Sequence, residues 1–242
     1  MPYKIHNRFK KFILITLFLS TALLKQINAQ QKDYIRPPLV SKYNTLKKQV
    51  AKDSLKRMLE LKSLIPTIVY DLRYATTNNF TGQLMYPANT HITFMRLPAA
   101  KALKKVQQEL ETKGLGLKIF DAYRPYSVTE KFWELIHDER YVAFPGKGSG
   151  HNRGVAVDLT IIDLQTGKEL DMGTGFDNFT DTAHQTFKDL PAAILQNRQL
   201  LRSVMEKHGF VAYEMEWWHY YLPESDQYEV LDIEFRKMKK EL

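Results

Sequence analysis

The chain contains no cysteine among its 242 residues. Disulfides and thiolate metal ligands are therefore excluded, and any bound metal must use histidine, aspartate or glutamate. No apolar run reaches the roughly 20 residues that a membrane-spanning helix needs. The sequence also lacks internal repeats, low-complexity tracts and a glycine-rich phosphate loop. The stability of the fold must come from the packing of an ordinary hydrophobic core.

The first 29 residues contain basic side chains but no acidic one. Four of the basic residues precede an apolar run from Phe12 to Leu24, and the small residue Ala29 follows. This order is typical of a secretory signal peptide. It predicts an exported protein, periplasmic or secreted, that is cleaved after Ala29 and keeps no stable membrane insertion. Because no cysteine follows, a bacterial lipoprotein anchor is excluded.

The net charge changes when this segment is removed. The whole chain carries a formal charge of +8, and the loss of five basic residues with the signal peptide leaves +3. A mildly basic chain suits an anionic wall or membrane surface but lacks the basic footprint of a nucleic-acid-binding protein. The 213 residues that remain suit one domain.

The order of the expected elements predicts an α+β fold. Residues 30–64 are interpreted as a linker and an N-terminal helical segment, mixed in pattern from about Val40 to Lys62, and residues 65–242 as the catalytic domain. Strands are expected over 67–74, 117–123, 154–162 and 210–222. Helices are expected from Pro98 to Gly114, from a capping box of Ser127 and Glu130, and from Pro191 to Gly209. We expect one compact domain with a mainly antiparallel central sheet flanked by helices and a zinc site at the sheet.

Two short motifs carry the candidate chemistry. The first, Ser149 to Asp158, has the pattern Ser-x-His-x-x-Gly-x-Ala-x-Asp, and the second, Glu216 to His219, has the pattern Glu-x-x-His. Catalytic zinc typically takes three protein ligands and leaves a fourth position for water. His151, Asp158 and His219 would supply those ligands. Glu216 would remain as a carboxylate beside the water, so the sequence predicts a metallohydrolase site with one Zn²⁺.

The expected geometry of these ligands requires a bend. If His151 lay at the entrance of a straight strand, Asp158 seven residues later would point to the opposite face. Gly154 is expected to permit a bend or bulge that brings both to one ion. Glu216 and His219, three apart in a β-prone run, require a kink or a helical turn.

Each candidate also has a structural interpretation. Taken singly, a histidine after a glycine loop is usually a loop residue, and Asp158 could be an ordinary cap or ion-pair residue. Glu214 competes with Glu216 for the role of the base. Trp217 and Trp218 are expected in the core rather than against the substrate.

Together the motifs resemble the zinc D-alanyl peptidases, which include D,D-carboxypeptidases and VanX-type D-alanyl-D-alanine dipeptidases. Glu216 to His219 and Asp121 to Pro125 are similar to the VanX-type branch in particular. Residues 70–76, 79–82 and 172–177 share this resemblance. It runs from about Ile68 to Leu222, and the motifs follow the order of the family.

The resemblance implies further roles. It assigns the zinc ligands to His151, Asp158 and His219, the catalytic base to Glu216, and stabilisation of the transition state to Arg124. It also assigns the substrate's ammonium to Asp177 and a place beside the substrate's carboxylate to Ser149. Gly150 departs from the family, because a second serine is expected there, and this puts one hydroxyl contact in doubt. Arg124 could instead form a structural ion pair.

The resulting hypothesis is an exported zinc dipeptidase that acts on D-alanyl-D-alanine or a similar small D,D-dipeptide. One alternative is a carboxypeptidase that trims peptidoglycan stem peptides, for which an open groove would be expected instead of a closed pocket. Another is a zinc-stabilised binding domain without catalysis, as in the related Hedgehog-type domains. The presence of Glu216 and Arg124 argues against this last alternative. The sequence leaves the oligomeric state open.

Overall fold

The computed structural model describes residues 34–239 of the chain. The predicted signal peptide, residues 1–29, lies outside the described residues. Residues 36–242 form one compact unit. Within residues 34–239, no helix is both long enough and apolar enough to cross a membrane.

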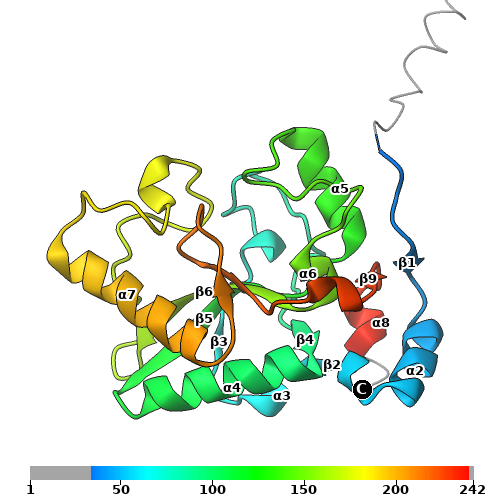
Figure 1. The fold of residues 1–242 in the computed structure, drawn as a ribbon, viewed down its shortest axis with the longest axis horizontal. Helices are drawn as coiled ribbons and strands as arrows, with labels where there is room; N and C mark the ends of the chain where they lie inside the picture. Colours follow the sequence, from blue (N-terminus) through cyan, green and yellow to red (C-terminus); the bar gives the residue numbers. More distant parts are fainter. Residues whose placement is uncertain (1–33, 240–242) are drawn as a thin grey trace, which may run out of the picture. The chain divides into compact units, whose positions relative to one another are not determined.

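A five-stranded sheet lies at the centre of this unit (Figure 1). Its strands, in spatial order, are β3 (Val69–Tyr70), β5 (Leu115–Asp121), β6 (Ala156–Asp163), β8 (His219–Tyr221) and β7 (Val211–Ala212). Only β3 and β5 pair in parallel, and every other adjacent pair in this sheet is antiparallel. β6 is buried along almost its whole length because both faces of the sheet are covered. The predicted α+β class with a mainly antiparallel central sheet is confirmed.

Helices α4 (Leu97–Glu111) and α7 (Ala192–Lys207) contact each other and cover one side of the sheet (Figure 1). As predicted, a proline stands in the first turn of α4, where its missing N–H costs nothing. Leu103, Val106 and Leu110 repeat at helical spacing on the buried face of α4 and are fully buried. Burying each such side chain stabilises the fold by about 1.5–3 kcal/mol.

Helix α5 (Tyr126–Leu135) lies on the opposite side of the sheet from α4 (Figure 1). Its predicted capping box is wrong. The Ser127 hydroxyl instead donates to Asp232 at 2.8 Å, and the Glu130 carboxylate accepts two hydrogen bonds of 2.7 Å from Arg36. Both side chains therefore bind partners about a hundred residues away in the chain instead of capping the helix.

Residues 36–64 pack into the same compact unit as residues 65–239. The expected helical stretch from Val40 to Lys62 is broken, because Met58–Glu60 form a strand that pairs with the strand before α4. The expected strand 67–74 is also shorter, since a 3-10 turn begins at Arg73. The remaining elements are β1 (Leu39–Val40) beside β9 (Val230–Leu231), α2 (Tyr43–Lys52), β2 (Met58–Glu60) beside β4 (Phe94–Arg96), α3 (Leu61–Leu64), α6 (Gly150–Arg153) and α8 (Phe235–Lys239).

Candidate active site

His151 lies in the short helix α6 and not at the entrance of a strand, so that part of the prediction is wrong. Ser149 caps this helix: its Oγ accepts from the Asn152 N–H at 3.2 Å, and the Asn152 side chain accepts from the Ser149 N–H at 2.9 Å. Gly154 ends the helix with φ +75°, a conformation that favours glycine. A helical turn followed by a left-handed residue therefore solves the problem of the odd spacing between His151 and Asp158.

Asp158 and His219 are direct partners across two antiparallel strands. Asp158 lies on β6 and pairs in register with His219, the first residue of β8. Ahead of β8, the Glu216 N–H donates to the Tyr213 carbonyl at 3.2 Å, and the His219 N–H donates to the Glu216 carbonyl at 3.3 Å. These bonds form the turn that the three-residue spacing of Glu216 and His219 required.

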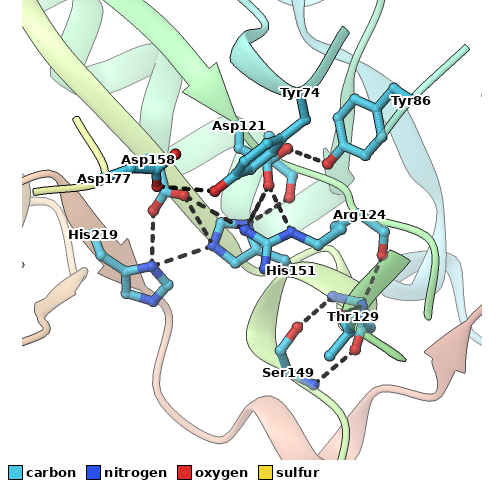
Figure 2. A network of polar contacts seen from close by, with 12 residues as sticks. Tyr74, Tyr86, Asp121, Arg124, Thr129, Ser149, His151, Asp158, Asp177 and His219 are labelled. Carbon is cyan, nitrogen blue, oxygen red and sulfur yellow. Dashed lines mark hydrogen bonds and ion pairs between the residues drawn. The ribbon is translucent and has the colours of Figure 1, made fainter. Parts of the chain in front are cut away.

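The three candidate ligands point toward one another (Figure 2). One ligand atom from each of His151, Asp158 and His219 lies within 4.8 Å of the others. His219 Nδ1 lies 2.8 Å from Asp158 Oδ1 and 3.2 Å from His151 Nε2, and His151 Nε2 lies 3.4 Å from Asp158 Oδ2. His151 Nδ1 lies 2.7 Å from the Ala122 carbonyl. A bond on this side fixes the ring and leaves Nε2 for a metal.

The electrostatics of the cluster suit metal ligation. Burial alone would raise the pKa of Asp158, but the charges and hydrogen bonds of His151 and His219 hold that pKa well below its usual range. Burial lowers the pKa of His219, against the opposing effect of Asp158. The cluster therefore favours a carboxylate and a neutral imidazole, the forms in which these side chains bind metal ions.

Arg124 is held beside this cluster by a buried aspartate. Its Nε donates to Asp121 Oδ2 at 2.9 Å, and its Nη2 forms an ion pair with the same oxygen at 2.8 Å and lies 3.8 Å from Asp158 Oδ2. The Tyr86 hydroxyl donates to the other Asp121 oxygen at 2.6 Å (Figure 2). Arg124 thus does form an ion pair, but it also lines the cavity in front of the metal ligands.

Asp177 enters the same cavity from a long loop. The Tyr74 hydroxyl donates to Asp177 Oδ1 at 3.0 Å, and the Phe80 N–H donates to Oδ2 at 3.5 Å. The residue is only half-buried as a whole, but the removal of its carboxylate from water raises the pKa of Asp177 to about 7. Its φ of +60° is uncommon for a residue other than glycine. An underpaired carboxylate in a strained backbone is typical of a ligand-binding position.

The cavity has a volume of about 230 Å³. His151, Asp158, His219, Glu216, Arg124, Asp177 and Ser149 all line it, so the structure brings every predicted site residue together. Glu216 is buried, and its Oε2 lies 3.9 Å from His219 Nδ1. Burial, reinforced by the charges of Asp158 and Asp177, raises the pKa of Glu216. The competing Glu214 is exposed and pairs with Arg202 at 2.9 Å.

Aromatic side chains from separate loops also line the cavity. The rings of Tyr141 and Phe179 stack at a centroid distance of 4.7 Å, and Phe80 contacts Phe179 at 5.3 Å. The Tyr213 hydroxyl donates to the Arg140 carbonyl at 3.1 Å and ties the loop of Tyr141 to the turn before β8. As expected, Trp217 and Trp218 are almost fully buried, although Trp218 also touches the cavity.

Ser149 and Gly150 both have structural roles in the placement of α6. The Ser149 hydroxyl already caps α6, so any contact with a ligand must share that oxygen. A Cβ at Gly150 would lie 2.9 Å from the Cβ of Ala156, closer than such atoms pack. The glycine therefore lets α6 lie directly on β6.

Sequence reasoning missed the residues that hold the predicted ones in place. Asp121 and Tyr74 both lie in segments that resemble the family, but the sequence indicated no role for either residue. A signal for Asp121 existed, because an acidic residue at the end of an apolar strand must find a partner when it is buried. The partners of Asp177 carried no such signal, since they belong to loops far apart in the chain.

Comparison with known proteins identifies the family. The sequence matches the Peptidase M15 family, described as D-Ala-D-Ala dipeptidase, over residues 54–240. The chain belongs to this family. A D-alanyl-D-alanine dipeptidase of Escherichia coli (strain K12) is 36% identical over 178 residues, which cover 74% of this chain and 91% of the relative. One from Streptomyces coelicolor is 38% identical over 182 residues, which cover 67% and 89%.

A more distant likeness relates the chain to a solved structure of the LdcB LD-carboxypeptidase. The two share 20% identity with a TM-score of 0.36, over 62% of this chain and 70% of the other. The predicted enzyme class rests on the sequence match instead, and it is confirmed: this member of the D-Ala-D-Ala dipeptidase family is a metallopeptidase.

The predicted cofactor, Zn²⁺, is confirmed by the family and by the donors present. Two imidazole nitrogens and a carboxylate oxygen are a donor set typical of catalytic zinc. Within residues 34–239, His151, Asp158 and His219 form the one cluster of this kind. They would hold the ion in this dipeptidase-family protein.

Proposed function

We propose that this protein is an exported zinc dipeptidase that hydrolyses D-alanyl-D-alanine or a similar small D,D-dipeptide. One observation carries the proposal: the His–Asp–His cluster, Glu216 and Asp177 line a single cavity of about 230 Å³. This volume is below the roughly 300–1,000 Å³ of pockets that hold drug-sized ligands. Relatives that are 33–38% identical are named D-alanyl-D-alanine dipeptidase, which supports the same substrate here.

The position of each side chain supports a catalytic role for it. A bound Zn²⁺ would supply a Lewis acid that polarises the scissile carbonyl and acidifies the attacking water. Glu216 would take the proton of that water and pass it to the departing amine. Arg124, held by Asp121, would donate hydrogen bonds to the oxyanion that develops on the carbonyl. Because Asp121 fixes the guanidinium in advance, little reorganisation is needed during the reaction.

Asp177 supports a substrate with a free amino end. An ammonium group in the cavity would pair with the Asp177 carboxylate, whose partners are one hydroxyl and one backbone N–H. An acylated amino end would bring no charge and would leave that carboxylate without a counter-ion. The stacked Tyr141 and Phe179 line the same small cavity. These features favour a dipeptide over a peptidoglycan stem peptide.

Export is part of the proposal and rests on the pattern of residues 1–29. An exported dipeptidase would meet free dipeptide released from the wall and not the cytoplasmic precursor pool. We therefore propose a role in salvage or turnover of wall material. Uptake of labelled alanine from external D-Ala-D-Ala should fall in a deletion strain, and unchanged uptake would count against salvage.

The decisive experiment measures alanine released from D-Ala-D-Ala by the purified protein before chelation, after chelation and after zinc return. Activity should disappear and recover with the metal. Glu216→Gln should retain zinc and lose about 10²- to 10⁴-fold in rate, as expected for a general base. Parallel assays with N-acetyl-D-Ala-D-Ala and a stem pentapeptide should show little cleavage. Cleavage of the stem peptide alone would favour a carboxypeptidase, and cleavage of nothing by zinc-loaded protein would favour a binding domain.

A further inference from the structure

A buried arginine on α7 binds the loop that carries Asp177. Arg198 is only 5% exposed. Its Nε donates to the Met172 carbonyl at 2.7 Å, Nη2 to the Thr182 carbonyl at 2.9 Å and Nη1 to the His184 carbonyl at 3.2 Å. One guanidinium thus joins both ends of an irregular loop.

Within residues 34–239, no carboxylate lies close enough to Arg198 to form an ion pair, whereas Arg202 on the same helix has two such partners. Burial of its charge is costly, and it lowers the pKa of Arg198. Three charge-assisted hydrogen bonds to carbonyls offset this cost. An apolar side chain would fill the same space without the cost of burying a charge. We therefore attribute the arginine at this position to the three loop carbonyls that its guanidinium binds.

The held loop needs such support because it has little regular structure of its own. Between Met172 and His184 its regular structure is the single 3-10 turn Asp181–Ala183. Met172 and Thr182 each lie five residues from Asp177. The neighbouring Asn197 donates to the Asp171 carbonyl at 2.9 Å, which adds a second tie from α7. A rigid helix therefore fixes both ends of the segment whose middle enters the cavity.

We propose that Arg198 is a positioning residue for substrate binding: through the carbonyls of Met172, Thr182 and His184, it holds Asp177 where the substrate's ammonium binds. The proposal rests on the proposed role of Asp177. Arg198 itself does not line the cavity, so its effect must pass through the loop. Lysine cannot replace it, because a single ammonium cannot reach three carbonyls in the fork geometry of a guanidinium.

The test is a double-mutant cycle on the zinc-loaded enzyme. Steady-state kinetics with D-Ala-D-Ala would compare wild type, Arg198→Lys, Asp177→Asn and the double variant. Each single substitution should raise KM about tenfold, the equivalent of about 1.4 kcal/mol, with a smaller change in kcat. The double variant should resemble Asp177→Asn alone, because groups that act as a unit are not additive. Additive effects, or an unchanged KM in Arg198→Lys, would overturn the proposal.

The cycle separates this inference from the one on which it rests. An unchanged KM in Asp177→Asn would overturn the proposed role of Asp177, and with it the reason for Arg198 to act. A raised KM in Asp177→Asn with additive behaviour of Arg198→Lys would overturn only the positioning role. A purely structural arginine would lower the melting temperature equally in both backgrounds and leave KM additive.

Two further variants guard against a loss of folding. Asn197→Ala removes the exposed tie to Asp171 and should raise KM by a smaller factor in a folded protein. Arg202→Lys is the matched control, because Arg202 lies one turn further along α7 and its partners among residues 34–239 are the carboxylates of Glu206 and Glu214. Its KM should stay unchanged. Hydrogen exchange of residues 172–184 should rise in Arg198→Lys but not in this control, and equal exchange in both would contradict the proposal.

Discussion

Asp158 and His219 are separated by 61 residues in the chain, yet they stand directly opposite each other on β6 and β8, with Oδ1 and Nδ1 2.8 Å apart. Opposite residues of an antiparallel pair lie closer than any others on two strands. The metal site is therefore built into the register of the sheet. A slip of one residue would turn one ligand to the other face and destroy the site.

Removal of the charge at the central ligand should release the metal. Asp158→Asn keeps the shape of the side chain but loses the negative charge that both histidines face. Loss of a residue that only supports a ligand typically lowers metal affinity by about 10- to 100-fold. We expect the loss of this ligand's charge to lower the affinity for zinc by more than that. Competition with a chromogenic chelator measures this affinity. Asp163→Asn, at the far end of the same strand, is the control, and equal affinity in both variants would rule out Asp158 as a ligand.

Asp121→Asn should lower both stability and rate. The substitution removes the nearer counter-ion of the buried Arg124 guanidinium and leaves Asp158 Oδ2 3.8 Å away, and breaking a buried ion pair typically costs about 3–5 kcal/mol. The free energy of unfolding from urea titrations should fall by about that amount. At saturating zinc, kcat should fall by about 10- to 100-fold, because the guanidinium loses its fixed orientation.

Tyrosines provide the matched pair for this prediction. Tyr86→Phe removes one hydrogen bond to Asp121 and should lower kcat by a smaller factor. Tyr123→Phe also removes a buried hydroxyl, but that hydroxyl bonds only to the backbone of Ile233, so kcat should not change. Identical rates for the two variants would show that Asp121 does not act on Arg124 during catalysis.

The raised pKa of Asp177 should make stability and binding depend on pH in opposite ways. Burial raises this pKa to about 7, from 3.8 in the unfolded chain. Between these values the folded protein binds the extra proton, so this residue's contribution to stability falls as pH rises toward 7 and then levels off. The stability of Asp177→Asn relative to wild type should therefore be higher at pH 8 than at pH 5. The melting temperature at both pH values measures this gain.

Substrate binding should show the opposite trend at the same residue. Below pH 7 the Asp177 carboxylate becomes neutral and loses its attraction for an ammonium, so KM should rise as pH falls. The KM of Asp177→Asn should not follow this trend. Asp181→Asn, an exposed acid in the same loop, should behave as wild type. A KM that rises equally in all three proteins would assign the titration to another group.

The aromatic lining of the cavity should set the length of the substrate. Phe179→Ala removes one ring of the stack with Tyr141 and enlarges the cavity. We expect the ratio of kcat/KM for a D,D-tripeptide to kcat/KM for the dipeptide to rise at least about tenfold. This change corresponds to about 1.4 kcal/mol. Phe187→Ala, between this loop and α7 and not among the residues that line the cavity, is the control. An unchanged ratio in Phe179→Ala would mean that the limit lies deeper in the pocket.

Several features of this protein could be predicted from local sequence. The ligand types at His151, Asp158 and His219 follow from two motifs and from the absence of cysteine. Pro98 and Gly114 bound a helix because each acts on its own backbone. The expected strands over 117–123 and 154–162 correspond to β5 and β6 of the α+β fold. The structure brings the three candidate ligands together and bears out the helix and the central strands, because each of these elements depends on a few consecutive residues.

The tertiary structure decided the rest, and the reason is the distance along the chain. His151 became helical because Ser149 and Asn152 cap it, and Ser127 lost its predicted cap to Asp232 because that acid lies beside it only in the folded state. Nothing near Arg198 in the sequence indicates that it would hold the loop of Asp177. Local patterns determine which chemical groups are present and which short elements form, whereas packing and strand register determine which of those groups meet.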